Sequence, residues 1–172
     1  MLCILASLIF IQGCTSLSGG SPLRKAKIAS SVNENEDMYI VGSAKVEDSG
    51  IEVARMKART TAKEELKNEI LKESKKIIET YLTDLDFYNK KLSDQIMTDL
   101  SEYVAEDIMT SAEEKSYWQE DGKAFVALSV KKDKIPTRTR TTFLKHLDGI
   151  MEKVKSLKER IESIPLEDQK VK

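Results

Sequence analysis

The dipeptide Asp121-Gly122 is the feature of this sequence that most restricts its fold. It separates two runs, AEEKSYWQE and KAFVALSVK, in which side-chain character alternates with a period of two. A turn of this composition tolerates positive φ angles and joins adjacent antiparallel strands. We therefore predict a β-hairpin over residues 112–131. Its second strand divides into two faces, Phe125, Ala127 and Ser129 on one and Ala124, Val126, Leu128 and Val130 on the other.

Most of the remaining sequence favours helix, because Lys, Glu, Leu and Ile are abundant while Gly and Pro are scarce. Ser49 and Glu52 have the spacing of a capping box, so a helix is expected to follow Ser49. Its predicted apolar stripe is Ile51, Ala54, Ala58, Ala62, Leu66, Ile70, Ile77, Tyr81 and Leu85. Residues 83–89 mark a break. A second amphipathic helix then carries Leu92, Ile96, Leu100, Tyr103, Val104 and Ile108.

A first strand is predicted over residues 38–46, MYIVGSAKV, which is rich in β-branched and aromatic side chains. Gly42 inside it indicates either a bulge or a close helix contact. The predicted fold class is therefore α+β. A small three-stranded antiparallel sheet is packed by two long helices in the order strand, helix, helix, strand, strand, and an amphipathic heptad helix follows at the C-terminal side.

The heptad helix is defined by seven apolar residues with spacings of 4-3-4-3-4-3, namely Phe143, Leu147, Ile150, Val154, Leu157, Ile161 and Ile164. We call these residues the seam. In a parallel pair of such helices, Lys153 and Arg160 on one flank would meet Lys158 on the other, so every cross-pair is like-charged. The seam is therefore expected to pack on its own domain, or alternatively on another surface of a neighbouring copy.

The N-terminal segment differs from the rest, because all 28 basic and 29 acidic side chains lie after residue 23. Residues 2–11 form an apolar run of signal-peptide length, much shorter than the roughly 20 residues that span a bilayer. Gly13 and Cys14 follow directly, and this junction resembles the lipobox of bacterial lipoproteins. The resemblance implies cleavage after Gly13, a diacylglycerol and further acyl chains such as palmitate on Cys14, and loss of Cys3. The alternative is a plain signal peptide or a buried apolar N-terminus.

A domain plan follows from these features. Residues 1–13 are the predicted lipoprotein signal peptide, and residues 14–37 are the lipidated cysteine and a flexible tether. The α+β domain covers residues 38–132, the heptad helix residues 133–165 and a tail residues 166–172. Thr15 follows the cysteine where an Asp would indicate inner-membrane retention, so the outer membrane is the expected location.

The sequence offers no catalytic constellation. His146 is the sole histidine, and Asp148, two residues on, lies on another helix face, so no triad is indicated. No His or Cys cluster has metal spacing, and the net charge of −1 gives no reason to expect a nucleic-acid partner. We predict a protein without enzymatic activity, metal or cofactor other than the lipid.

Two features admit a binding role as well as a structural one. Trp118, the sole tryptophan, is expected to pack in the core or on the sheet, and alternatively to stack on a ligand. The basic stretch of residues 131–142 is expected to be a solvated hinge, and alternatively to meet anionic headgroups or glycans.

Two segments carry a family resemblance. YIVGSAKV followed by ARMKARTTAKEEL resembles the opening of the LPP-twenty lipoprotein family, with Ala54-Arg55 and Ala58 in the family's Ala-Arg-x-x-Ala spacing. SYWQEDGKAFVALSV looks like that family's closing hairpin. The resemblance covers about residues 38–131, and the heptad helix lies outside it.

The resemblance implies a small α+β domain on a bacterial envelope lipoprotein, some relatives being surface antigens and others rings of the flagellar basal disk. We therefore expect a structural or assembly role, with the membrane, other envelope proteins or further copies as partners, and a motility-associated disk as one version. The alternative is an envelope binding module for a peptide, glycan or small ligand, or a surface-exposed antigen or adhesion lipoprotein.

Overall fold

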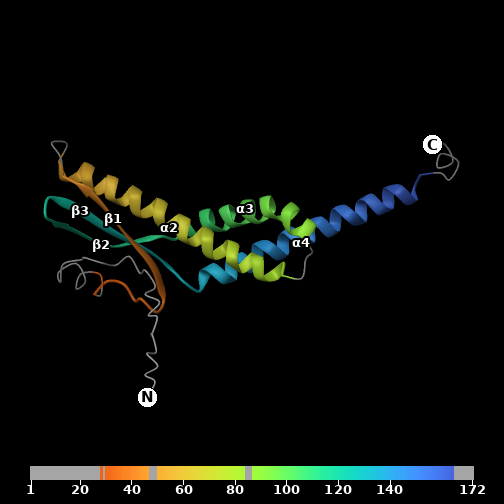
Figure 1. Cartoon of the computed structure of the whole chain (residues 1–172), viewed down its shortest axis with the longest axis horizontal. Coiled ribbons are helices and arrows are strands. Elements are labelled where there is room, and N and C mark those ends of the chain that lie inside the picture. Colours follow the sequence, from red (N-terminus) through yellow and green to blue (C-terminus); the bar gives the residue numbers. More distant parts are fainter. Residues whose placement is uncertain (1–27, 29, 47–49, 84–86, 165–172) are drawn as a thin grey trace, which may run out of the picture.

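Three strands and three helices make up the described part of the chain (Figure 1). This computed structural model describes residues 28, 30–46, 50–83 and 87–164. In chain order the elements are β1 (Asp37–Lys45), α2 (Ile51–Tyr81), α3 (Phe87–Met109), β2 (Glu113–Glu120), β3 (Lys123–Lys131) and α4 (Lys134–Glu162). Helices and an antiparallel sheet thus combine in one fold, and the α+β class predicted from the sequence is confirmed.

The sheet has the strand order β1-β3-β2, and both pairings are antiparallel. Asp121 and Gly122 turn the chain between β2 and β3 with φ angles of 50° and 68°. Two successive positive φ angles suit the right-handed twist of a hairpin, and the hairpin predicted from Asp121-Gly122 is confirmed. A register shift between Glu114 and Ser116 interrupts the pairing of β2 with β3.

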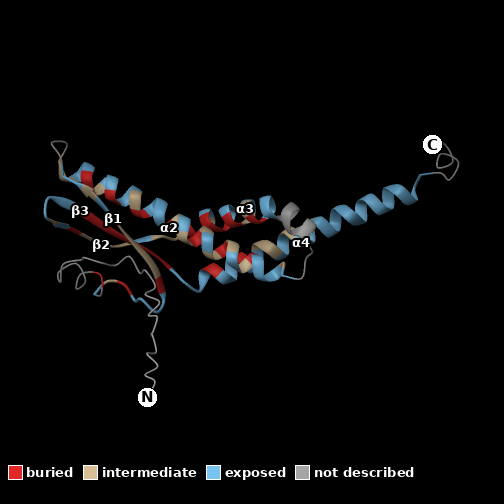
Figure 2. Cartoon of the chain, viewed as in Figure 1, coloured by how far each residue is buried: buried red, intermediate tan, exposed pale blue. Residues whose placement is uncertain are grey.

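The central strand β3 is buried on both of its faces, and every residue from Ala124 to Val130 is buried. On one face Val126, Leu128 and Val130 join a core cluster with side chains of α2, α3 and α4. On the other face Phe125 and Ala127 form a second cluster with Trp118, Ile28 and Val32. The two faces predicted for this strand are therefore confirmed, and each face is buried in a different cluster (Figure 2).

The prediction of a flexible tether is wrong for its described C-terminal part. Ile28 and Val32 are buried against the sheet, since they complete the cluster around Trp118. Asn33 to Asp37 form a hydrogen-bonded turn in which the Asp37 N–H donates to the Asn33 carbonyl at 2.7 Å. Ile28 and Val32 thus cover one face of the sheet. The sequence did not predict this role, because both residues stand alone in a polar segment.

Helix α2 packs against β1 at Gly42. A Cβ atom on Gly42 would stand 2.6 Å from the backbone nitrogen of Ala62 and closer still to the carbonyl oxygen of Ala58. Of the two predictions for Gly42, the close helix contact is confirmed. The bulge is wrong, because the pairing of β1 with β3 runs without a shift through Gly42 and Val126.

The buried face of α2 winds around the helix. Its buried residues are Ala54, Ala58, Ala62, Leu66, Ile70, Ser74 and Ile78. Each step of four residues advances the buried position by about 40°, so the buried face turns by about 240° along the helix. Winding suits a helix that contacts the sheet as well as α3 and α4. The predicted continuation of the stripe is therefore wrong for Tyr81, which is 45% exposed, and only partly right for Ile77. Leu85 lies outside the described residues.

Two further details of the helices differ from prediction. Gly50, not Ser49, is the N-cap of α2 and supplies no side-chain hydrogen bond, while Ser49 lies outside the described residues. In α3 the buried positions are Met97, Ser101, Val104, Ala105, Ile108 and Met109. Ile96 and Tyr103 are exposed, because the early part of α3 is rotated by about one residue from the predicted stripe.

Helix α4 begins at Lys134, within the stretch predicted to be a hinge. Ile135 and Thr139 are buried, and the Thr139 hydroxyl donates to the carbonyl of Ile135 at 2.7 Å. The hinge prediction is therefore wrong for the described structure. One buried residue per turn, Ile135 and then Thr139, holds the first turns of α4 against the body.

The close approach at Gly42 yields a stability prediction. Gly42→Ala is expected to lower the free energy of unfolding by about 3 kcal/mol or more, because backbone atoms of α2 block the new methyl group. Urea denaturation followed by circular dichroism measures this loss. Gly149→Ala is the control, since a Cβ there meets nothing within 4 Å. An equally stable Gly42→Ala variant would contradict the packing of α2 on β1.

Candidate functional site

The C-terminal half of α4 extends beyond the body of the protein, and Figure 1 shows it projecting from the other helices. Every described residue from Ile150 to Ile164 is exposed, as the unbroken pale blue of this segment shows (Figure 2). The first half is held by α2 and α3, which α4 contacts. Helix α4 is thus rooted at one end and uncovered at the other.

The seam lies mostly on this uncovered part. Phe143 is half-buried, and its ring packs on Tyr81 of α2 with centroids 5.2 Å apart. The exposed fractions of Leu147, Ile150, Val154, Leu157, Ile161 and Ile164 lie between 39% and 61%. The prediction that the seam packs on its own domain is therefore correct for Phe143 and wrong for the other six residues, because α4 extends past the elements that would cover them.

Two further apolar side chains widen this surface. Leu144 is 48% exposed and Met151 is 69% exposed. Both follow a seam residue by one or four positions, so they lie along one border of the seam. The apolar surface of α4 is thus broader than the seam alone. We call the seam residues from Leu147 onward, with Leu144 and Met151, the apolar face of α4.

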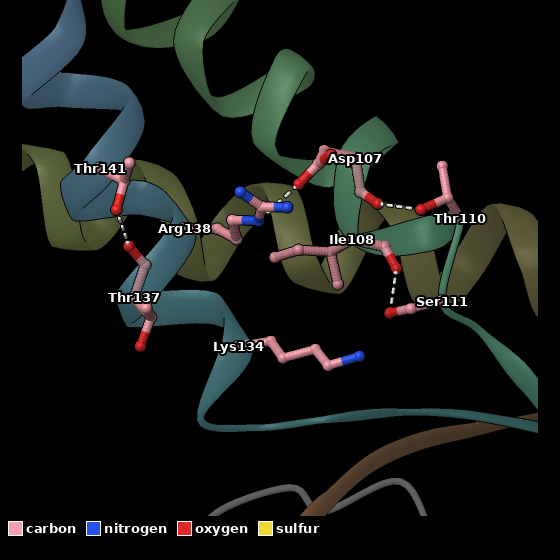
Figure 3. Close-up of a pocket in the computed structure, with 8 residues that line it drawn as sticks. All are labelled: Asp107, Ile108, Thr110, Ser111, Lys134, Thr137, Arg138 and Thr141. Atoms are coloured by element: carbon pink, nitrogen blue, oxygen red, sulfur yellow. Dashed lines mark hydrogen bonds and ion pairs between the residues drawn. The ribbon is translucent and has the colours of Figure 1, made fainter.

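A small pocket lies where α3 ends and α4 begins (Figure 3). It is lined by Asp107, Ile108, Thr110, Ser111, Lys134, Thr137, Arg138 and Thr141. The Arg138 guanidinium pairs with the Asp107 carboxylate at 2.8 Å. The hydroxyls of Thr110, Ser111 and Thr141 each donate to a backbone carbonyl of their own helix end. The pocket's polar groups are therefore mainly engaged with one another, and the ion pair fastens α4 to α3.

No catalytic grouping appears among the described residues. His146 is half-buried on α4, and Asp148 is exposed. No three His, Cys, Asp or Glu side chains within residues 28–164, as far as these are described, are grouped to hold a metal ion. The described helices include none that is long and apolar enough to cross a membrane.

Trp118 is 3% exposed and lies inside the second cluster. Its ring stacks on Phe125 with centroids 5.2 Å apart and an interplanar angle of 9°. Of the two roles considered for Trp118, packing describes what the structure shows, because the ring is not accessible to a ligand. The residues that close this site are Ile28 and Val32, which the sequence did not identify.

A second ion-pair site joins the N-terminal turn to the end of β3. Lys131 Nζ lies 2.9 Å from both the Asp37 and the Glu36 carboxylates. The side chain of Asp37 is buried, and the Asn33 N–H also donates to it at 3.1 Å. The hydrogen bond from Lys131 is the main cause that lowers the pKa of Asp37, and the Asn33 N–H adds to it, although burial opposes both. The pKa of Lys131 is raised by Glu36 and Asp37.

Arg55 is the one polar residue of the Ala-Arg-x-x-Ala spacing. Its guanidinium pairs with Glu114 at 2.7 Å and lies 4.6 Å above the ring centroid of Tyr117. Arg59, one turn further, approaches the same carboxylate at 3.7 Å. These contacts tie α2 to the edge strand β2 next to its register shift. The sequence resemblance singled out Arg55 but not its partner, because no local spacing connects residues 59 positions apart.

The residues predicted for lipid attachment, Gly13 and Cys14, lie outside the described residues, as does Cys3. Comparison with known proteins found no family model that matches the chain and no curated protein of significantly similar sequence. The resemblance to LPP-twenty lipoproteins therefore stays a prediction from Ala54-Arg55, Ala58 and the hairpin.

The Asp37 site yields a pH prediction. Because the folded-state pKa of Asp37 lies below its ordinary value of 3.8, the stabilisation is fully present above that value. It is lost as the pH falls through the lowered folded-state pKa. Asp37→Asn should lower the urea midpoint at about pH 6 and flatten its fall toward about pH 3 relative to the wild type. An unchanged acid-side slope in the variant would contradict the assignment.

Proposed function

We propose that this protein is a non-enzymatic, lipid-anchored lipoprotein of the bacterial cell envelope with a structural or assembly role. The lipobox-like junction of Gly13 and Cys14 behind an apolar run of signal-peptide length supports the anchor. The LPP-twenty resemblance of residues 38–131 supports the envelope location. A motility-associated disk of the outer membrane is the finer version that this resemblance suggests, and the heptad helix is an addition to the family pattern.

The observation that carries the proposal is the uncovered apolar face of α4. Six of its residues belong to the heptad seam, and five of these lie on α4, which is held to the body by Ile135, Thr139 and the Arg138–Asp107 ion pair, while Ile164 directly follows the helix end. Contiguous exposed apolar surfaces of this kind mark sites of interaction with proteins or membranes. In this proposal the domain supports α4, and the exposed apolar face of α4 binds another component of the envelope.

The alternative of a small-ligand binding module has less support. Trp118, its best candidate for ligand stacking, is buried against Phe125. In the basic stretch, Lys131 pairs with Asp37 and Glu36, and Arg138 pairs with Asp107. These charges already have intramolecular partners, so an incoming anion would have to displace them.

The anchor is tested by metabolic labelling with a palmitate analogue in a bacterial host that processes lipoproteins. The wild-type chain should incorporate the label, and Cys14→Ser should abolish it, because the thiol carries the lipid. Cys3→Ser is the matched control and should label normally, since Cys3 leaves with the signal peptide. Equal labelling of the wild type and Cys14→Ser would contradict the anchor.

A further inference from the structure

We propose that the apolar face of α4 lies in the surface of a phospholipid leaflet, parallel to the membrane plane. This inference rests on the proposed function, because the lipid at Cys14 would place the domain at a membrane. It names a partner for the exposed face and thereby deepens the structural role.

The width of the apolar face favours a flat partner. With 100° per residue, the side chains from Leu157 through Val154 to Leu144 cover an arc of about 140° on α4. A seam that pairs with one helix is narrower, since it uses positions a and d alone. A helix that rests in the headgroup region buries a broad apolar arc and keeps its polar side in water.

Basic side chains follow one border of this arc and also lie within it. Lys153 and Arg160 lie along the border next to Leu157, and Lys158 lies inside the arc between Leu147 and Met151. The opposite border is mixed in charge, because Lys155, Asp148 and Glu162 lie near Leu144, and the Glu162 carboxylate lies 3.8 Å from Lys158 Nζ. Glu152 and Glu159 lie on the polar side of the helix. Long basic side chains at such borders reach the headgroups while their stems lie on apolar surface.

The same charges disfavour a second copy as the occupant. In a parallel pair the flanking positions bring Lys153 opposite Lys158, and in an antiparallel pair each basic flank meets itself. Both arrangements therefore place like charges together, at a cost of a few tenths of a kcal/mol for each contact. Anionic headgroups, in contrast, complement the border of Lys153 and Arg160 and also Lys158 within the arc.

The contacts of the first turns of α4 with the body are compatible with α4 lying on a membrane surface. Ile135 and Thr139 are buried, and Arg138 pairs with Asp107, so the helix direction is fixed by the body. From Leu147 to its end at Glu162 the helix is about 22 Å long. The domain would then contact the leaflet through α4 as well as through its anchor, and the fixed first turns of α4 would set its orientation on the membrane.

The test uses the full chain with Cys3→Ser and Cys14→Ser, so that no lipid anchor forms. Either Val154→Cys or Ser156→Cys is added and labelled with an environment-sensitive nitrobenzoxadiazole dye. These two positions are two residues apart in sequence but lie about 160° apart around the helix. With vesicles containing phosphatidylglycerol, the dye at Val154 should shift its emission to the blue and the dye at Ser156 should not. Circular dichroism checks that both labelled chains are folded.

A second variant tests the charge argument. Lys153→Gln with Arg160→Gln should weaken binding to the anionic vesicles by roughly fivefold for each residue changed. Both residues are exposed, so the fold should be unaffected. Unchanged affinity in this variant would overturn the role of the basic border.

Three results with the labelled chains would overturn the proposal. The first is no shift at Val154 with vesicles, and the second is an equal shift at Val154 and Ser156. The third is a shift at Val154 in water that grows with protein concentration, which would identify a second copy as the occupant. Because Cys14 is absent, the outcome is independent of the palmitate experiment, so failure of the anchor and failure of the α4 contact are distinguishable.

Discussion

The whole arrangement depends on the close approach of α2 to β1 at Gly42. No side chain separates the strand from the backbone of Ala58 and Ala62, so the long helix lies directly on the sheet. This contact fixes the helix across the face on which Val126, Leu128 and Val130 form the main cluster. From there α2 continues past the sheet and offers its later turns to α3 and α4. The position of α4, and hence of its exposed face, follows from where α2 crosses the strand.

The sheet is small, and its central strand needs cover on both sides. The helices cover one side, and the cluster of Trp118, Phe125, Ile28 and Val32 covers the other. The ion pair of Lys131 with Asp37 holds the turn before β1 to the end of β3. The described residues before β1 are therefore joined to the domain through specific contacts.

The sequence predicted correctly those features that depend on neighbouring residues alone. The Asp121-Gly122 turn, the alternation of β3 and the Ala54–Ala58–Ala62 stripe each specify their own structure, and all were predicted correctly. Predictions failed where partners change along an element. The buried face of α2 moves to Ser74 and Ile78 because the later turns of this helix pack on other helices and no longer on the sheet. The buried face of α3 also differs from the predicted stripe. Ile28 and Val32 escaped notice, because two apolar residues in a polar segment have no periodicity. The seam was predicted from its spacing, but its exposure depends on where α2 and α3 end, and Leu144 and Met151 were not predicted to extend it.

An exposed apolar helix that is rooted by a few side chains should be the least protected helix of the molecule in water. Amide hydrogen exchange of the unlipidated full chain, measured with and without anionic vesicles, tests this directly. The account predicts slow exchange in α2 and in the first turns of α4, fast exchange from Ile150 to Glu162 in water, and protection of that segment when vesicles are added. Strong protection of Ile150 to Glu162 in water, or no gain in protection with vesicles, would contradict it.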